Sequence, residues 1–218
     1  MRQTPRVIVL QPVLEIYGPD GFALWPVAEF EAYGFLPLSG ALSPAEVGTA
    51  VMRIADYNNV DPEDNSPPRP ADPLGAFLHG LLTMDDVLSP GGLRVTDTAT
   101  GITLLPGCCN GLEERHDWLE VLDGDGGGYF GHDPTPLAER HGDSVRLTVD
   151  AERDDSPVIE LPAAELRHLL AGAERDLADF LGLAADWAAQ HLPSHATSVT
   201  VALARALDLP APVVPSKP

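Results

Sequence analysis

The side chains with the greatest chemical reactivity in this sequence are two adjacent cysteines. Cys108 and Cys109 are the only cysteines in the chain, and His116 and His132 are the histidines nearest to them in the sequence. A thiolate is a nucleophile, and an imidazole within hydrogen-bonding reach can take up the thiol proton. These four residues are therefore the candidate catalytic residues.

The surroundings of the cysteines favour a reactive thiol in one respect and disfavour it in another. A helix is predicted from Asn110, and the positive end of its dipole lowers the pKa of a thiol just ahead of it. Glu113 and Glu114 follow, and their negative charges disfavour a thiolate. Cysteines outside disulfides are also common as small buried side chains. A structural role for Cys108 and Cys109 therefore stands beside a catalytic one.

A zinc site could be built only from these same cysteines and histidines. Structural zinc sites take about four such ligands, with two or more residues between paired cysteines. Cys108 and Cys109 have none between them. Further along, Asp123-Gly124-Asp125 begins like a calcium loop, but the twelfth position is Pro134, where that loop needs a glutamate. We therefore expect no metal ion and no other cofactor.

One further segment could carry general acid–base chemistry. His132 and Asp133, together with Glu139 and His141, would bring acid and base groups together if the surrounding segments form facing strands. The polar ends of any strand pair offer as much. Motifs such as Gly-x-Ser-x-Gly and His-Glu-x-x-His are absent from the sequence. The sequence thus names no particular reaction.

The chain is strongly acidic. It has 33 acidic and 13 basic residues, which give a formal net charge of −20. Binding of nucleic acid depends on lysine and arginine side chains that neutralise phosphates, so we expect no nucleic-acid partner. A basic protein would be attracted at long range. The alternative explanation is that the acidic residues only keep the protein soluble.

Two segments in which acidic residues gather are candidate binding surfaces. The first acidic set is Glu113, Glu114, Asp117, Glu120, Asp123 and Asp125, and the second acidic set is Asp150, Glu152, Asp154 and Asp155. We expect a negative patch if the two sets adjoin in the fold. A solvated helix face and a hairpin tip explain them equally well.

The elements that must position these residues predict an α+β fold, with a mostly antiparallel sheet and helices packed on one face. Strands are expected where β-branched residues run or alternate, at about 7–10 and 13–17 on either side of Pro12, and at 22–25, 93–97, 102–105, 129–132, 136–140, 144–150 and 158–161. Helices are expected where a capping residue or a proline precedes regularly spaced apolar residues, at about 44–57, 73–82, 110–124, 162–191 and 195–207. The long helix near the C-terminus has the most continuous apolar stripe.

The sequence favours one domain over residues 1–209. Within it, the polar and proline-rich residues 58–71 should form an exposed loop, and residues 210–218 should form a disordered tail. No segment reaches the roughly 20 apolar residues that span a membrane, no signal-peptide core is visible, and no disulfide framework is present. We therefore expect a cytoplasmic protein without a membrane partner. The sequence leaves the oligomeric state open, and the apolar stripe of the long helix is compatible with a dimer.

Two functions remain after these exclusions. The first is a non-catalytic acidic module that binds a basic protein, such as an inhibitor, an immunity-type protein or a regulatory partner. The alternative is a small cytosolic enzyme whose site lies near Cys108, Cys109, His116 and His132. The first rests on the net charge and the absence of catalytic motifs, and the second on the chemistry of the four candidate residues.

Overall fold

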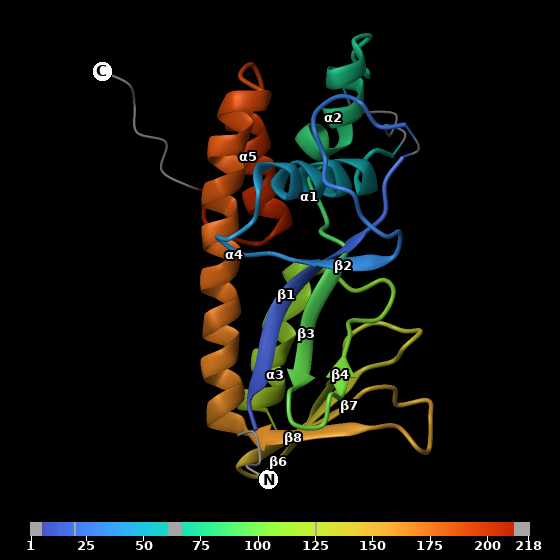
Figure 1. Cartoon of the computed structure of the whole chain (residues 1–218), viewed down its shortest axis with the longest axis vertical. Helices are drawn as coiled ribbons and strands as arrows, with labels where there is room; N and C mark the ends of the chain where they lie inside the picture. Colours follow the sequence, from blue (N-terminus) through green and yellow to red (C-terminus); the bar gives the residue numbers. More distant parts are fainter. Residues whose placement is uncertain (1–5, 20, 61–66, 125, 212–218) are drawn as a thin grey trace, which may run out of the picture. The chain divides into compact units, whose positions relative to one another are not determined.

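The computed structural model describes residues 6–19, 21–60, 67–124 and 126–211. These residues form two four-stranded antiparallel sheets and five α-helices, which confirms the predicted α+β class (Figure 1). The strands are β1 (Ile8–Ile16), β2 (Gly34–Pro37), β3 (Gly91–Asp97), β4 (Thr103–Leu104), β5 (Gly127–Tyr129), β6 (Leu137–His141), β7 (Ser144–Thr148) and β8 (Val158–Pro162). The helices are α1 (Pro44–Tyr57), α2 (Pro73–Thr83), α3 (Asp117–Asp123), α4 (Ala163–His191) and α5 (Ala196–Ala206), with the short 3₁₀ helix η1 (Leu112–His116) ahead of α3.

The chain folds into two compact units. Unit 1 comprises residues 1–13 and 91–176, and unit 2 comprises residues 14–90 and 177–218. The strand orders are β2-β1-β3-β4 in one sheet and β5-β6-β7-β8 in the other. The single domain expected over residues 1–209 stays a prediction.

Unit 1 is built around the β5–β8 meander. Consecutive strands pair antiparallel, with Ala138 opposite Leu147 and Val145 opposite Leu161. These four side chains are buried and join a core in which Trp118 of α3 stacks on Phe130 at 4.2 Å between ring centroids. Alternation along each strand directs one face into this core, as the period of two in the sequence predicts.

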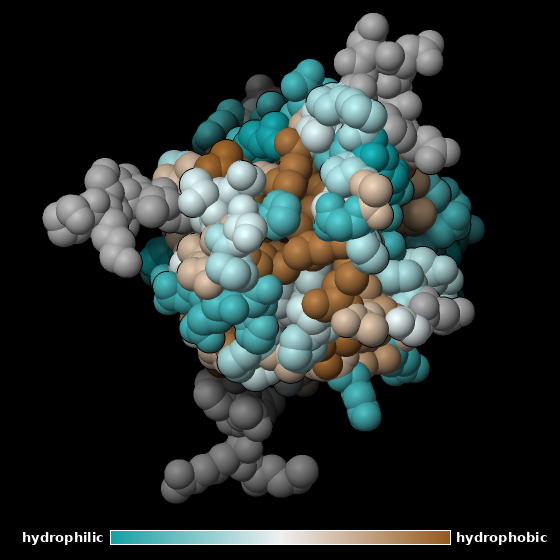
Figure 2. Space-filling model, turned by 90° about the horizontal axis from the view of Figure 1, so that it is seen from above, coloured by the Kyte–Doolittle hydropathy of each residue, from teal (hydrophilic) through white to brown (hydrophobic). Residues whose placement is uncertain are grey.

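Unit 2 is mostly helical. α1 begins at a capping box, in which the Ser43 hydroxyl accepts a hydrogen bond from the Glu46 N–H and the Glu46 carboxylate accepts one from the Ser43 N–H. Trp25 packs edge-on against Trp187, with the ring centroids 5.6 Å apart, and donates its indole N–H to the carbonyl oxygen of Gly48 at 2.8 Å. Figure 2, which views the end where α2 and α5 lie, shows apolar residues in a band between hydrophilic ones.

Several predicted strands and helices agree with the structure. The long helix near the C-terminus, the helices that begin at Pro44 and Pro73, the β3–β4 hairpin and the strands β6, β7 and β8 all form close to their expected bounds. The strand expected at 129–132 forms earlier, as β5 at Gly127–Tyr129, and shares only Tyr129 with the prediction. In the hairpin, Val95 lies opposite Leu104. In these segments the local residue pattern and the observed structure agree because the pattern itself creates the buried face.

The N-terminal strands were predicted wrongly in two places. β1 runs through Pro12 without a break, because the missing N–H affects one side of the strand only and the four-residue β2 does not extend along all nine residues of β1. Residues 22–25 form no strand. The Phe22 ring instead packs edge-on against Trp25, with the ring centroids 4.8 Å apart, and lies against Phe77, with the centroids 5.2 Å apart. β2 was not predicted.

The helix predicted from Asn110 to Gly124 is also replaced by shorter elements. η1 begins at Leu112 and α3 only at Asp117. Asn110 does not cap a helix, because its buried side-chain amide donates to the carbonyl oxygen of Gly91 at 2.8 Å. The dipole of a long helix therefore does not act on the cysteines.

The exposed loop expected at 58–71 has ordered flanks. Residues 61–66 lie outside the described residues, as do residues 212–218 of the expected tail. Asn58 is buried, and its side chain bonds the carbonyl oxygens of Ile54 and Leu88. Arg69 bonds the side chain of Asn59 and the carbonyl oxygen of Ala76. Among the described helices, none is long and apolar enough to cross a membrane.

Candidate functional site

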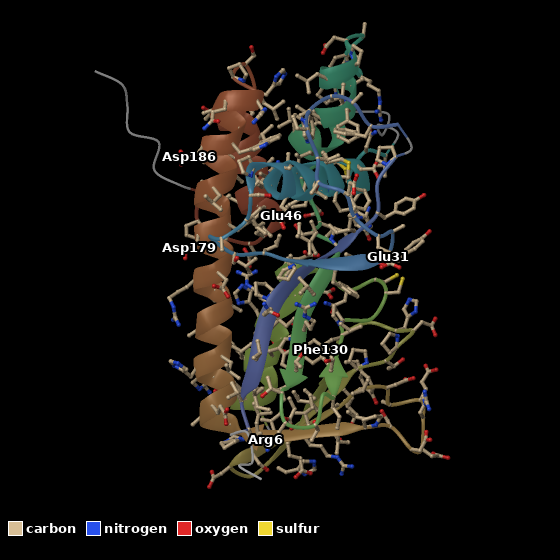
Figure 3. All side chains as sticks on the ribbon, in the orientation of Figure 1. Arg6, Glu31, Glu46, Phe130, Asp179 and Asp186 are labelled. Carbon is tan, nitrogen blue, oxygen red and sulfur yellow. The ribbon has the colours of Figure 1, made fainter. Side chains whose placement is uncertain are left out.

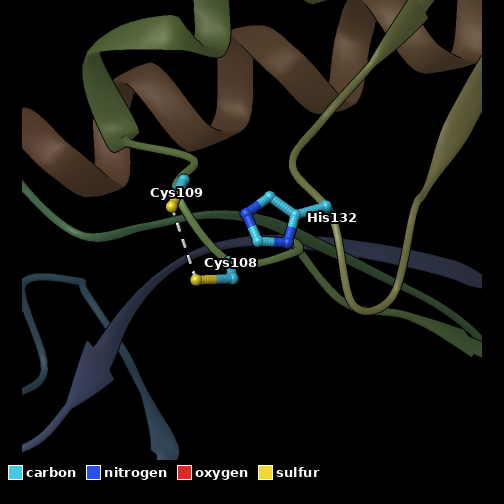
Figure 4. Close-up of side chains that lie close together, drawn as sticks. All are labelled: Cys108, Cys109 and His132. Carbon is cyan, nitrogen blue, oxygen red and sulfur yellow. Dashed lines mark hydrogen bonds between the residues drawn. The ribbon is translucent and has the colours of Figure 1, made fainter.

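Unit 1 brings both cysteines and His132 together on two backbone segments. Cys108 and His132 form an isolated antiparallel bridge, with the Cys108 N–H donating to the His132 carbonyl at 2.6 Å and the His132 N–H donating to the Cys108 carbonyl at 3.1 Å. The Gly107 N–H bonds the Phe130 carbonyl at 2.9 Å, which extends the pairing toward the core. These bonds fix the two segments side by side (Figure 4).

The three side chains form a compact cluster, here named the Cys–His cluster. The two Sγ atoms are 3.5 Å apart, and one donor atom from each of Cys108, Cys109 and His132 lies within 4.8 Å of the others. His132 hydrogen-bonds Cys109 through its side chain, while its Nδ1 lies 3.3 Å from Oδ2 of Asp133. Figure 4 shows a ring nitrogen directed toward Cys109. The imidazole of His132 therefore lies between the Cys109 thiol and the Asp133 carboxylate.

All three members of the Cys–His cluster are exposed. A buried, purely structural position for the cysteines is therefore not what the structure shows. The His132 side chain is 56% exposed and that of Asp133 is 86% exposed. Solutes in bulk water can reach the thiols, which is the first requirement for any chemistry at this site.

The electrostatics of the cluster favour a protonated ring. The pKa of His132 is raised above its ordinary value, first by the hydrogen bond to Cys109 and then by the hydrogen bond to Asp133. The negative charge of Cys109 acts in the same direction, and desolvation opposes it. A charged ring beside a thiolate is stabilised by both partners.

The backbone at the Cys–His cluster allows little variation. A Cβ on Gly107 would lie 2.3 Å from the carbonyl oxygen of Pro134 and 2.5 Å from the amide nitrogen of His132. Gly131 has φ +97°, and a Cβ there would lie 2.6 Å from the carbonyl carbon of Gly107. Cys109 has φ +62°, which is a left-handed conformation that L-residues with side chains seldom adopt. Clustering of such conformations is typical of functional sites.

The turn between β7 and β8 bonds the segment that carries His132. The Ala151 N–H donates to the Thr135 carbonyl at 2.8 Å. The Thr135 N–H donates to Asp150, and the Thr135 hydroxyl bonds Glu152 at 3.2 Å. The segment that carries His132 is thus held both by the cysteine segment and by this turn.

The structure separates the remaining candidates from the cluster. His116 is exposed at the end of η1 and is not a member of the Cys–His cluster. Glu139 and His141 lie on β6, where their backbones pair with neighbouring strands of the meander. Among the described residues, neither side chain belongs to the cluster that contains His132, so the expected acid–base grouping does not form there. Asp133 was noticed in the sequence only as part of that grouping. Its position next to His132 was the available signal.

The two acidic sets occupy different elements of unit 1. In the first acidic set, Glu114, Asp117, Glu120 and Asp123 are exposed on η1 and α3, Glu113 is half-buried, and Asp125 lies outside the described residues. Asp123 also forms an ion pair with Arg167 of α4. In the second acidic set, Asp150 and Glu152 bond within and around the β7–β8 turn, and Asp155 pairs with Arg153 at 3.4 Å. Part of this charge therefore organises local structure.

Unit 2 contains a pocket that the sequence did not indicate. It has a volume of about 340 Å³ and lies between β2, the start of α1 and the segment before β2. Phe30 and Phe35 line it together with the acidic residues Glu29, Glu31 and Glu46. Glu31 and Glu46 are labelled in Figure 3. No lysine or arginine belongs to the lining of this carboxylate pocket.

Glu46 keeps its charge in the carboxylate pocket. Its pKa is lowered, first by the side-chain hydrogen bond with Ser43 and then by the bond from the Ser43 backbone. The wall beside it is fixed, since the Ala28 N–H donates to both the Thr49 hydroxyl at 2.9 Å and the Ala45 carbonyl at 3.1 Å. The lining thus combines an ionised residue with aromatic ones, a composition that suits a cationic ligand.

The Cys–His cluster can donate two sulfurs and one nitrogen to a metal ion, or can use one thiol as a nucleophile and the ring as its base. Both uses follow from the donor chemistry and the short distances. Comparisons of the chain with protein-family models, with curated proteins and with solved structures found no match.

Proposed function

We propose that this protein is a small thiol enzyme in which Cys109 is the nucleophile. The observation that carries the proposal is geometric: the Cys109 Sγ and a ring nitrogen of His132 lie within 4.8 Å of each other, and the His132 Nδ1 faces Oδ2 of Asp133 at 3.3 Å. A nucleophile, a base and a group that orients the base are the three parts that thiol catalysis requires. Here all three come from one exposed face of unit 1.

The order of the side chains gives each a role in acyl transfer. The Cys109 thiol passes its proton to the His132 ring, and the sulfur attacks an electrophilic carbonyl carbon. The ring then returns the proton to the leaving group, and water releases the acyl group from the sulfur. Asp133 holds the ring in orientation. Cys108 has no part in these steps.

The reactivity of the two cysteines tests this proposal. We expect iodoacetamide to modify Cys109 faster than Cys108, as read by peptide mass spectrometry after brief exposure. His132→Asn should slow modification of Cys109 by about 10-fold or more, because the thiolate loses its partner. His116→Asn is the matched control, since His116 is exposed in the same unit but lies outside the cluster.

A catalytic readout completes the test. A simple activated ester should give an acyl-protein on Cys109 that mass spectrometry detects, and Cys109→Ser should abolish it while Cys108→Ser should not. Equal alkylation rates at the two cysteines, or an unchanged rate in His132→Asn, would contradict the proposal.

The second candidate function is binding of a basic protein, and the carboxylate pocket is the observation that favours it. Three acidic and two aromatic residues belong to its lining, which contains no lysine or arginine. An arginine or lysine side chain would gain from both the charges and the rings. The exposed residues of the first acidic set would raise the association rate with such a partner.

Salt dependence and charge removal test this second function. An arginine-rich peptide should bind, and its affinity should fall steeply as salt is raised. The double variant Glu29→Gln/Glu31→Gln should weaken binding, whereas Glu165→Gln on the exposed start of α4 should have little effect. Binding that ignores both salt and the double substitution would rule the pocket out.

A further inference from the structure

We propose that the Cys–His cluster binds a thiophilic divalent metal ion, represented by Zn²⁺, through Cys108 Sγ, Cys109 Sγ and a ring nitrogen of His132. A fourth coordination position stays open to water. The site shares Cys109 and His132 with the proposed nucleophilic site, but it does not rest on that function. It is carried by a separate observation, which is the position of the Cys108 sulfur.

The distances between the donors match those of a tetrahedral site. Two thiolates bound to one tetrahedral zinc ion at about 2.3 Å each are about 3.8 Å apart. The Sγ atoms of Cys108 and Cys109 are 3.5 Å apart, and the ring donor lies within 4.8 Å of both. Only a small movement of the imidazole therefore closes the site around an ion.

This geometry also explains why sequence spacing argued against zinc. The spacing rule describes ligands in a regular loop, where adjacent side chains point apart. Cys109 instead has the left-handed φ of +62°, and in this conformation the adjacent Sγ atoms lie close together. The third ligand comes from His132, which the backbone bridge places opposite Cys108.

The position of Asp133 supports a ligand role for the ring. Histidines that bind metals usually donate their second ring N–H to a carboxylate or carbonyl, which fixes the tautomer and the ring orientation. The Nδ1 of His132 faces Oδ2 of Asp133 at 3.3 Å. That arrangement assigns Nε2 as the ligand atom.

The chemistry of the donors selects the ion. Thiolate ligands favour zinc and other soft ions over calcium and magnesium, which prefer oxygen. On binding, the cluster releases two protons to solvent, so that both sulfurs bind as thiolates and His132 binds as a neutral ring. Two thiolates then balance the double positive charge, and the open position leaves the ion in the three-ligand class of zinc sites.

Cobalt(II) gives a direct optical test on the full-length reduced protein. Titration should produce near-ultraviolet thiolate-to-cobalt charge-transfer absorption with a stoichiometry of one ion per chain, and Zn²⁺ should displace it. Cys108→Ser, Cys109→Ser and His132→Ala should each weaken binding by more than about 10-fold, and Asp133→Asn by about 10-fold. His141→Gln, an exposed histidine on β6, is the matched control and should bind as the parent does.

The Cys108→Ser variant separates this inference from the proposed enzyme. It should lose cobalt binding while Cys109 keeps its fast alkylation, because the nucleophile does not need the second thiol. Zn²⁺ should protect Cys109 from iodoacetamide in the parent protein but not in Cys108→Ser. Circular dichroism establishes that each variant is folded. Absence of charge-transfer absorption in the reduced parent, or its full retention in Cys108→Ser, would overturn the proposal.

Discussion

The two units hold their reactive groups by different means. In unit 1 the Cys–His cluster stands on backbone segments locked by reciprocal N–H to carbonyl bonds and by glycines with no space for a Cβ. In unit 2 the carboxylate pocket lies where aromatic side chains, a capping box and a helix start meet. Unit 1 should therefore be sensitive to a single added methyl group, whereas unit 2 should be sensitive to lost side-chain contacts and to charge.

The largest expected effect is on the core beneath the Cys–His cluster. Trp118 is 1% exposed and stacks on Phe130, whose carbonyl accepts the Gly107 N–H. Trp118→Ala should lower the free energy of unfolding by about 3–5 kcal/mol and make the two cysteines react at similar rates. Urea unfolding and alkylation measure both. Leu119→Ala, at a side chain 37% exposed, is the control, and equal costs for the two variants would refute this account.

A smaller change should break the backbone lock itself. Gly107→Ala forces the new Cβ against the Pro134 carbonyl and the His132 amide, so we expect a loss of about 1–3 kcal/mol and of the reactivity difference between Cys108 and Cys109. Gly126→Ala is the matched control, because its Cβ would meet nothing within 4 Å. If Gly107→Ala kept fast alkylation at Cys109, the cluster would not depend on this backbone.

Acid should act on the capping box of unit 2. The pKa of Glu46 is lowered below its ordinary value of 4.5, so its stabilisation is fully present above that pH and is lost as pH falls through the lowered value. Glu46→Gln should therefore be less stable than the parent at neutral pH, and the difference should shrink in acid. Ser43→Ala should cost about 1 kcal/mol at neutral pH.

Thermal unfolding at several pH values tests the role of Glu46. Glu120→Gln, at an exposed carboxylate on α3, serves as the control. A stability difference between Glu46→Gln and the parent that persists unchanged at pH 3 would show that the carboxylate charge is not what matters.

The smallest expected effect is the gain in stability when alanine replaces glycine in α4, a helix that contributes residues to both units. Gly172 belongs to the part of the helix in unit 1 and Gly182 to the part in unit 2, and a Cβ at either meets no atom closer than 3.8 Å. Alanine at each should raise stability by about 0.5–1 kcal/mol, since glycine is a poor helix former. Calorimetry shows whether each substitution shifts one common transition or only that of its own unit.

The sequence predicted the elements whose residues carry a local period. The apolar stripe of α4 and the alternation of Val145 and Leu147 in β7 each define a buried face without help from distant residues. β2 escaped prediction because its four residues, Gly34–Pro37, are all half-buried and show no alternation. Phe22 was assigned to a strand because its apolar character is shared by strands and by aromatic clusters.

The candidate site was predicted in composition but not in arrangement. Cys108, Cys109 and His132 were chosen for their chemistry, whereas the bridge that unites them joins two segments outside the regular strands. Such pairing has no local residue pattern. His116 was chosen for nearness in sequence, and the replacement of one helix by η1 and α3 left it outside the cluster. The carboxylate pocket gave no signal because its acids come from separate segments.

The left-handed backbone of Cys109 also bears on how this sequence can evolve. A residue with a Cβ in that conformation is less stable there than glycine by about 1–2 kcal/mol. Cys109→Gly would thus raise the stability of the fold while removing the thiol. On stability alone this position favours glycine, so the fold carries the sulfur of Cys109 at a cost in stability.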